Sequence, residues 1–381
     1  MHNSYDTIVI GAGAMGSAAA FYLAKRGQRV LLLEQFEIDH RKGSSYGYSR
    51  IIRYSYDHPE YVDLMKDTFP LWFALEDELG ETLYHQTGGI DFGPADDKSL
   101  RDTIKAVEMS GISHELLSAD EARKRFPQFC FAGDFQVLCQ PDSGFVAASS
   151  AVRGHIQLAR RHGAIVLDRT PVEDIRVAPQ SVDVNAGGES YSAGGLIVAA
   201  GSWAKTLLRR TGLELPLRLL RCQLNFMAPA DMGPFESERC PVWIAHVSER
   251  FSESVYGIPS HEGSGFKIAF HSGPPVSRLE YIDYEPDASN VESLRPFMRA
   301  HIPGIASAPA RESRICLYTQ TPDEHFIIDR HPEHQHVAIG AGFSGHGFKF
   351  STMVGKMLAD IALDGHTPHN DCLFKISRFL D

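Results

Sequence analysis

Hydrophobic residues near the start of the chain form two short unbroken runs separated by a helix-like stretch. Residues 5–10 and 29–33 are almost continuously apolar, which is typical of strands buried on both faces of a parallel sheet. Residues 18–26 are rich in Ala, Leu, Phe and Tyr and end at Gly27, which predicts a helix. The pattern therefore predicts a strand–helix–strand unit at the N-terminus.

The rest of the chain shows two kinds of pattern. Up to about residue 215, stretches with helical periodicity alternate with short buried runs, as in the N-terminal unit. From about 216 to 319 the runs are short, aromatic and separated by turns, which favours an antiparallel sheet in a second domain. Helices are predicted over 58–79 and 147–162, and strands over 87–94, 164–167, 171–175 and 196–200.

The composition is that of a globular protein with room for more than one core. The chain has 381 residues, of which 43% are hydrophobic, enough for two domains. The net charge of -11 argues against nucleic acid or an anionic membrane as a partner. We find no apolar run of about 18 residues and no signal-peptide pattern, so we expect a cytoplasmic protein. Six scattered cysteines without a CxxC pair predict neither a metal site nor a disulfide framework.

A glycine-rich loop joins the first predicted strand to the first helix. Gly11 permits a tight turn, Gly13 lets the backbone approach a pyrophosphate, and Gly16 lets the helix pack against the strand. Glu34 closes the second strand, 18 residues beyond Gly16, where a carboxylate binds ribose hydroxyls and would repel a 2′-phosphate. The loop, with Met15 inside it, is therefore predicted to bind a dinucleotide.

A second glycine-rich stretch lies almost at the other end of the chain, at residues 340–349. If both ends serve one cofactor, the chain returns to its own start, which suits a flavin better than a lone nicotinamide. The polar stretch 40–53 has small residues that would let its backbone lie against a ligand, and it carries the fixed charges of Arg50 and Arg53. Taken alone, such a stretch is more often a solvated loop that leads into a helix.

Three stretches together resemble the monomeric sarcosine oxidase and N-methyltryptophan oxidase family, within the D-amino-acid-oxidase superfamily. They are 11–16 with Glu34, 314–329 around Cys316, and 342–350. The resemblance runs over essentially the whole chain and implies an α/β (α+β) fold and a monomer. It implies a discontinuous Rossmann-like FAD-binding domain of glutathione-reductase type, built from 1–85, 145–215 and 320–381. The second domain, with an antiparallel sheet for the substrate, would then comprise 86–144 and 216–319.

The resemblance also implies how FAD is held. In that family a cysteine at this position forms a thioether to the flavin's 8α carbon, so the resemblance implies that Cys316 anchors FAD covalently. Without the resemblance, Cys316 would be interpreted as one more buried thiol. The positions that we predict to contact FAD are Gly11, Gly13, Met15, Gly16, Glu34, Ser44, Arg50, Val172, Gly201, Trp203, Cys316, Gly342, Gly345, His346, Gly347 and Lys349.

The same resemblance implies catalytic residues. Lys267 matches the lysine that speeds the reaction of reduced flavin with dioxygen in that family. The alternation of polar and apolar residues around it would, without the resemblance, predict a solvent-facing residue on a strand. His271 lies an even number of positions further on, so the two share a strand face, and it matches a substrate-side histidine. Tyr318 matches an aromatic wall beside the substrate.

Substrate binding is implied for Arg53, Lys349 and Tyr256. Arg53 and Lys349 match the two cations that hold the substrate carboxylate, which aims the carbon beside nitrogen at the flavin. The other interpretation of Lys349 is a cation at a helix N-terminus, where the helix dipole would disfavour it.

Two departures from the family leave the substrate open. Tyr46 stands where the family has a histidine near the flavin. Residues 243–256 form a longer stretch than in the family, with Val255 in place of a tyrosine over the substrate.

The expected activity is oxidation of a secondary (N-methyl or N-alkyl) amino acid to an imine that hydrolyses, with dioxygen reduced to hydrogen peroxide. A cyclic imino acid such as pipecolate or proline, or a fructosyl amino acid, is an alternative substrate. A flavin dehydrogenase with a protein or quinone acceptor, and a flavin-binding protein without turnover, are more distant alternatives.

Overall fold

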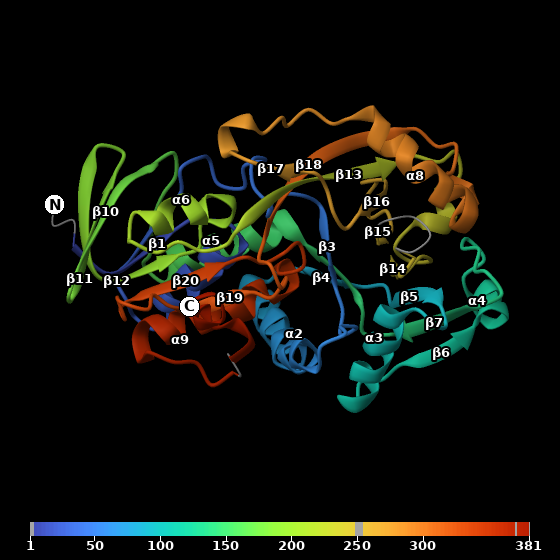
Figure 1. Cartoon of the computed structure of the whole chain (residues 1–381), viewed down its shortest axis with the longest axis horizontal. Coiled ribbons are helices and arrows are strands. Elements are labelled where there is room, and N and C mark those ends of the chain that lie inside the picture. Colours follow the sequence, from blue (N-terminus) through green and yellow to red (C-terminus); the bar gives the residue numbers. More distant parts are fainter. Residues whose placement is uncertain (1–3, 248–253, 370–371, 381) are drawn as a thin grey trace.

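The computed structural model describes residues 4–247, 254–369 and 372–380. The molecule is elongated, with one large sheet in each half and helix α2 (Pro59–Leu79) near the middle (Figure 1). Strands β3 (Ser49–Ile52), β4 (Tyr84–Gln86) and β8 (Gly144–Ala147) form a small third sheet. None of the helices that the structure describes combines the length and the apolar character needed to cross a bilayer.

The N-terminal unit forms as predicted, with one difference. β1 (Ser4–Ile10) pairs in parallel with β2 (Val30–Leu33), and helix α1 (Ala14–Lys25) connects them. The helix begins four residues earlier than the periodicity predicts. The reason is that the glycine loop itself supplies the first helical turn, with Gly13 as the N-cap and the Ser17 N–H bonded to its carbonyl at 3.0 Å.

β1 and β2 belong to an eight-stranded sheet with the order β10-β11-β12-β1-β2-β9, to which β20 and β19 are joined through β12. Four pairings are parallel: β1 with β12, β1 with β2, β2 with β9, and β12 with β20. The strand bounds are β9 (Ile165–Leu167), β10 (Val172–Ala178), β11 (Ser181–Ala186), β12 (Glu189–Val198), β19 (Ile327–Arg330) and β20 (Val337–Ala341).

The other half contains a nine-stranded sheet that is antiparallel except where β14 meets β5. Its order is β17-β13-β16-β15-β14-β5-β7-β6, and β18 pairs with β13. The bounds are β5 (Gly89–Pro94), β6 (Glu115–Ser118), β7 (Phe135–Gln140), β13 (Arg218–Met227), β14 (Val242–Ala245), β15 (Val255–Ile258), β16 (Phe266–Phe270), β17 (Pro275–Val276) and β18 (Ala310–Gln320). The domain boundaries expected from the sequence stay a prediction.

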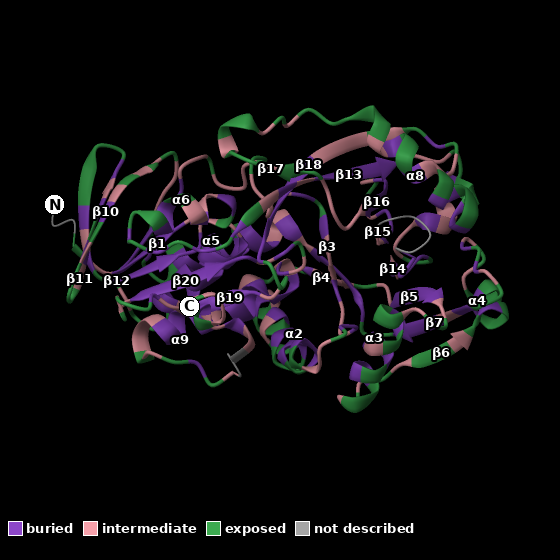
Figure 2. Cartoon of the chain, viewed as in Figure 1, coloured by how far each residue is buried: buried purple, intermediate pink, exposed green. Residues whose placement is uncertain are grey.

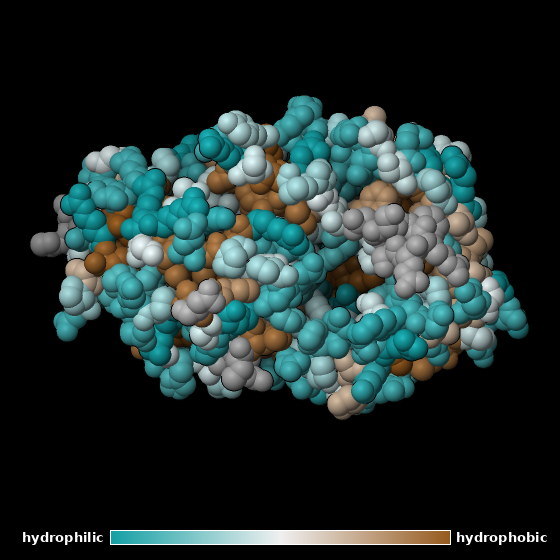
Figure 3. All heavy atoms as spheres, in the orientation of Figure 1, coloured by the Kyte–Doolittle hydropathy of each residue, from teal (hydrophilic) through white to brown (hydrophobic). Residues whose placement is uncertain are grey.

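Helices cover both sheets. α5 (Ala148–Arg161) and α9 (Ser351–Asp364) pack against α1 in the first half. The other α-helices in the described part of the chain are α3 (Lys98–Met109), α4 (Ala119–Arg125), α6 (Ala204–Arg209) and α8 (Ala288–His301). Burial is concentrated in the strands and in the inward faces of the helices (Figure 2), and hydrophilic side chains dominate the face seen in Figure 3.

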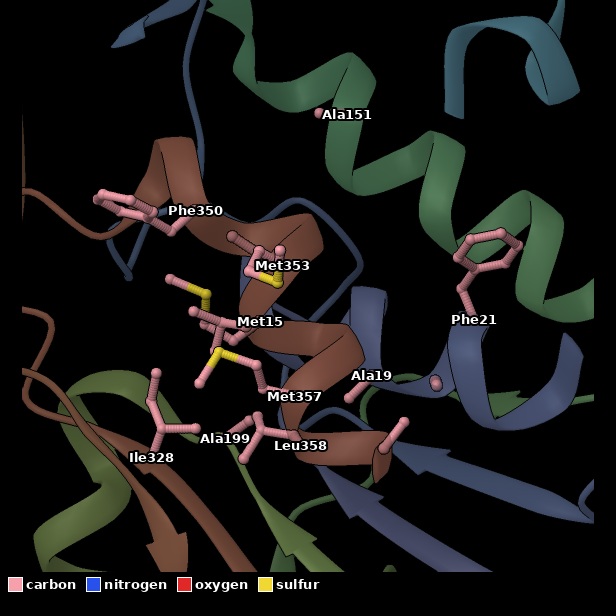
Figure 4. Close-up of a cluster of buried hydrophobic side chains, with 14 of the residues drawn as sticks. Met15, Ala19, Phe21, Ala151, Ala199, Ile328, Phe350, Met353, Met357 and Leu358 are labelled. Carbon is pink, nitrogen blue, oxygen red and sulfur yellow. The ribbon is translucent and has the colours of Figure 1, made fainter. Parts of the chain in front are cut away.

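The largest hydrophobic cluster joins residues from both ends of the chain. Met15 of α1 lies in it close to Met353 and Met357 of α9 (Figure 4). A few helical turns near the C-terminus therefore complete the core that the first thirty residues begin.

Gly355 allows α1 and α9 to approach closely. A Cβ at this position would lie 2.3 Å from Ala18 Cβ and 2.6 Å from the Ala18 carbonyl carbon. We expect Gly355→Ala to lower the free energy of unfolding by about 1–3 kcal/mol, despite the better helix propensity of alanine. Denaturant unfolding measures this, and Gly133→Ala is the control because a Cβ there meets nothing within 4 Å. Equal stability of the two variants would contradict the packing argument.

Candidate functional site

A single large cavity opens at the carboxyl ends of the parallel strands. Gly11 follows β1, Glu34 follows β2, Ala199 follows β12 and Gly342 follows β20, and all four line a cavity of about 770 Å³. β1 lies between β2 and β12: the chain runs from β1 to β2 on one side and later returns on the other side at β12 and β20. Such a switch point creates a crevice where ligands bind in α/β sheets.

The glycine loop forms one end of this cavity, and its glycines add no side chains to the wall. Gly11 has a φ of +99°, and a Cβ there would lie 2.6 Å from the Ala199 carbonyl oxygen. A Cβ on Gly13 would lie 3.0 Å from Ser45 Oγ. The N-terminus of α1 follows immediately, and its N–H groups and dipole suit phosphates. The loop therefore leaves an open, positively polarised cradle.

The Glu34 carboxylate is buried beside this cradle. Its Oε2 accepts the Ala12 N–H at 2.9 Å, and its Oε1 accepts the Phe36 N–H at 3.0 Å. These bonds hold the loop in place, and Glu34 still lines the cavity. Gly16 does not line it: a Cβ there would lie 1.8 Å from the Gly11 carbonyl oxygen, so this glycine serves the packing of α1. The cradle, the carboxylate and the length of the cavity fit a flavin dinucleotide.

Cys316 lies further along the same cavity, on β18. The residue is 4% exposed, and its Sγ lies 3.9 Å from the Ser44 carbonyl oxygen. The Ser44 hydroxyl donates to the Leu317 carbonyl, which fastens the 40–50 segment to β18. Directly across the ladder on β13 stands Cys222, which is fully buried. The cavity thus runs from the glycine loop to the Cys316 thiol.

Lys267 of β16 is buried in the cavity wall. It is 1% exposed, and its Nζ donates to the Ser49 carbonyl at 3.1 Å. Burial, and then the positive charge of Arg50, hold the pKa of Lys267 well below its usual value. Arg50 itself donates to the carbonyls of Ser44 and Tyr46, both at 2.8 Å. The interpretation of Lys267 as a solvent-facing strand residue is therefore wrong.

Arg53 and Lys349 both lie against the ring of one tyrosine, Tyr56. The Arg53 guanidinium is 4.9 Å and the Lys349 Nζ is 5.0 Å from the centre of its ring. Lys349 Nζ also donates to Tyr56 Oη at 2.8 Å and to the His346 carbonyl at 3.0 Å. Burial, and then the charge of Arg53, lower the pKa of Lys349 well below its usual value. Two cations this close favour a bound anion.

Lys349 is not a solvated cation at a helix end. It belongs to a 3₁₀ turn (Phe348–Phe350) just before α9 and is 6% exposed. The turn directs the side chain into the cavity, away from the solvent that would normally surround a lysine.

Aromatic side chains form another part of the cavity wall. The hydroxyls of Tyr256 and Tyr318 lie 3.3 Å apart, and burial raises the pKa of both well above its usual value. The His271 ring centre lies 5.9 Å from that of Tyr256 and 5.6 Å from that of Tyr318. Burial, followed by the charges of Lys349 and Arg53, lowers the pKa of His271 to about 4. This imidazole is therefore neutral at pH 7.

The cavity brings together the other predicted positions as well. Residues 248–253 of the long stretch noted in the sequence lie outside the described residues, whereas Val255 lines the cavity. Every predicted site residue except Gly16 lines it: Gly11, Gly13, Met15, Glu34, Ser44, Arg50, Arg53, Val172, Gly201, Trp203, Tyr256, Lys267, His271, Cys316, Tyr318, Gly342, Gly345, His346, Gly347 and Lys349.

Sequence reasoning missed several residues of the cavity and its supporting layer. Tyr56 contacts both cations, and Asp91 is buried beside Arg53. Ser55 and His246 are hydrogen-bonded to Asp91. No motif marks this group, because Asp91 and His246 lie far along the chain from Arg53, Ser55 and Tyr56 and meet them only in space. The one available signal was an aspartate inside an otherwise apolar predicted strand, 87–94.

Comparisons with known proteins agree with this geometry. The family model described as FAD dependent oxidoreductase matches residues 6–361. Monomeric sarcosine oxidase from a Bacillus species is 36% identical over 99% of this chain and 98% of its own length. N-methyl-L-tryptophan oxidase from Salmonella agona is 32% identical over 98% of this chain and 99% of its own.

A solved structure shows the same fold. L-proline dehydrogenase from P. horikoshii superposes with a TM-score of 0.87 at 23% identity, covering 100% of this chain and 98% of that one. The glycine cradle, the cavity and the match over nearly the whole sequence lead to one conclusion: the chain is an enzyme of the FAD-dependent oxidoreductase family.

Proposed function

We propose that this protein oxidises a secondary amino acid, an N-methyl or N-alkyl amino acid, with dioxygen as the electron acceptor. The observation that carries the proposal is the pair of cations, the half-buried Arg53 and the buried Lys349, in the same cavity as the buried Lys267. An anion-binding pair suits an amino acid carboxylate. A further cation suits chemistry in which negative charge develops. The relatives named as sarcosine and N-methyl-L-tryptophan oxidases support the same substrate class.

The chain's own residues would bind and orient the substrate. Arg53 and Lys349 hold the carboxylate, and the wall formed by Tyr256 and Tyr318 confines the rest of the molecule. The neutral His271 can accept a hydrogen bond from the substrate. When bound along the glycine loop and Glu34, FAD would supply the redox chemistry, as the acceptor of a hydride equivalent from the carbon beside nitrogen and as the donor of electrons to dioxygen, which gives peroxide. The buried wall limits the water that surrounds the reacting carbon.

The first test is whether secondary amino acids reduce the flavin. Under anaerobic conditions, N-methyl amino acids should bleach the flavin absorbance, and in air they should release hydrogen peroxide. Faster turnover with an artificial acceptor than with dioxygen would indicate a dehydrogenase. A flavin that no amine bleaches would indicate a binding protein without turnover. Pipecolate, proline and fructosyl amino acids belong in the same screen.

We further propose that Cys316 bonds FAD covalently. The buried Cys316 thiol lines the cavity close to the Ser44 carbonyl oxygen. We expect acid precipitation of the protein to leave a yellow pellet, and Cys316→Ala to move all of the colour to the supernatant. Cys222→Ala is the matched control, because this thiol lies opposite on the next strand and outside the cavity wall. A colourless wild-type pellet would refute the bond.

The cellular setting remains part of the proposal. We propose that the protein is a cytoplasmic monomer, and the similarity to monomeric sarcosine oxidase supports the monomer. We also propose that it binds neither nucleic acid nor membrane, because its net charge of -11 would repel both nucleic acid and an anionic membrane surface. Gel filtration tests the oligomeric state.

A further inference from the structure

A buried carboxylate stands behind the substrate-binding arginine. Asp91 of β5 is 3% exposed, and its Oδ1 lies 3.4 Å from the Arg53 guanidinium. The same oxygen lies 3.0 Å from His246 Nε2, and Oδ2 accepts the Ser55 hydroxyl at 2.6 Å. Arg53 in turn donates to Ser55 Oγ at 2.7 Å. Arg53 and His246 therefore share one carboxylate oxygen.

Asp91 is held in its charged form. Burial alone would raise its pKa, but the charge of Arg53 together with the hydrogen bonds from His246 and Ser55 outweighs burial and keeps the pKa below its usual value. The buried negative charge therefore persists at neutral pH.

This charge changes the balance of the anion site. Arg53 and a protonated Lys349 bring two positive charges and Asp91 one negative charge, so the three groups together carry a net charge of +1. Arg53 lowers and Asp91 raises the pKa of Lys349. One bound carboxylate neutralises these three groups. A second carboxylate beside it would find neither Arg53 nor Lys349 left to pair with it.

The cavity wall next to Arg53 is polar. His246 Nδ1 lies 3.2 Å from the Ser99 hydroxyl, at the start of α3. Arg53, Ser55, Ser99 and His246 all line the cavity. A substituent of the substrate that runs along this wall meets hydroxyls and an imidazole, with the Asp91 charge directly behind them.

We propose that Asp91 makes the site selective for amino acids with a single carboxylate and a neutral, hydrogen-bonding substituent, and that it excludes dicarboxylates. This inference rests on the proposed function, since it assumes that Arg53 and Lys349 hold the substrate carboxylate. Its physical basis is that like charges brought together in a desolvated site repel strongly. A neutral amide or hydroxyl instead finds partners on the polar wall.

The test compares ligands that differ only in charge. N-methylglutamine and N-methylglutamate have nearly the same shape, as do N-(carbamoylmethyl)glycine and iminodiacetate. For each pair, the rate and saturation of anaerobic flavin reduction give the selectivity in turnover. Analogues of the second pair with sulfur in place of the amine nitrogen give the selectivity in binding without any reaction.

In the wild-type enzyme, we expect the amide of each pair to be preferred by roughly tenfold or more, which corresponds to about 1.4 kcal/mol. Asp91→Asn should shift the ratio toward the dicarboxylate by at least that factor. Asp91→Glu keeps the charge and should keep the preference for the amide even where its rates fall. The exposed Asp142→Asn should leave the ratio unchanged.

The outcomes separate this inference from the proposed function. An equal affinity of the wild-type enzyme for both sulfur analogues would overturn the role of Asp91, and this result does not depend on whether any variant folds. An unchanged ratio in a folded Asp91→Asn would do the same. Flavin that no secondary amino acid reduces, while the sulfur analogues still bind selectively, would instead overturn the proposed function and leave the charge selection standing.

Discussion

Lys267→Met is expected to slow the reaction of the reduced enzyme with dioxygen on the order of 10²–10³-fold, the range seen when one preorganised electrostatic contact is removed from an active site. Reduction of the enzyme by substrate should persist. The reason is that a cation stabilises the negative charge that develops as electrons reach oxygen, and it does so most strongly in a site from which water is excluded. Stopped-flow mixing of the reduced enzyme with oxygenated buffer measures the effect.

The burial of Lys267 sharpens this expectation. Lys267 is buried, and its Nζ donates to the Ser49 carbonyl. Methionine has a similar length and no charge to desolvate, so the variant should fold. Lys267→Arg keeps the positive charge and should retain most of the oxygen reactivity. Unchanged oxygen reactivity in Lys267→Met would remove Lys267 from the oxidative half of the reaction.

Lys349→Met is expected to weaken substrate binding by roughly 30- to 3,000-fold, the equivalent of the 2–5 kcal/mol lost when one partner of a buried charge pair is truncated. Lys349 uses two of its three N–H groups on Tyr56 Oη and the His346 carbonyl. Among the residues that the structure describes, the third N–H group has no partner, so it is available to a ligand. Titration with a carboxylate whose amine nitrogen is replaced by sulfur measures the dissociation constant directly.

Lys356→Met is the matched control for this variant. Lys356 lies seven residues further along, on α9, and pairs with Asp360 at 2.8 Å outside the cavity wall. Its loss should leave the dissociation constant unchanged. If Lys349→Met binds the analogue as tightly as the wild-type enzyme, the carboxylate does not lie between Arg53 and Lys349.

The two lysines together show how function and stability are opposed at this site. Burial lowers the pKa of both well below the usual value for lysine, so each charged ammonium costs folding free energy. A site that keeps two such groups is typical of catalysis or anion binding. Replacing either by methionine should therefore leave thermal stability unchanged or raise it.

Much of the fold could be predicted from local pattern. Apolar runs identified the parallel strands β1 and β2 but only the last three residues of β12, whose first part is more polar, and helical periodicity identified α2 to within a residue. The predicted start of α1 is four residues too late, because glycine has a low helix propensity and a local pattern therefore excludes the glycine loop from the helix. In the fold, the backbone of this loop donates hydrogen bonds to Glu34 and Ser45, which lie elsewhere in the chain.

Local pattern was enough to predict the cofactor end of the cavity, because a glycine loop, a following helix and a closing carboxylate act over short distances along the chain. The cations of the substrate end were predicted from the resemblance to the sarcosine oxidase family. How those cations are balanced depends on contacts between distant parts of the fold. Asp91 reaches Arg53 across 38 residues, and Tyr56 reaches Lys349 across 293. Coulomb forces and hydrogen bonds depend on distance in space, and no pattern along the chain records that distance.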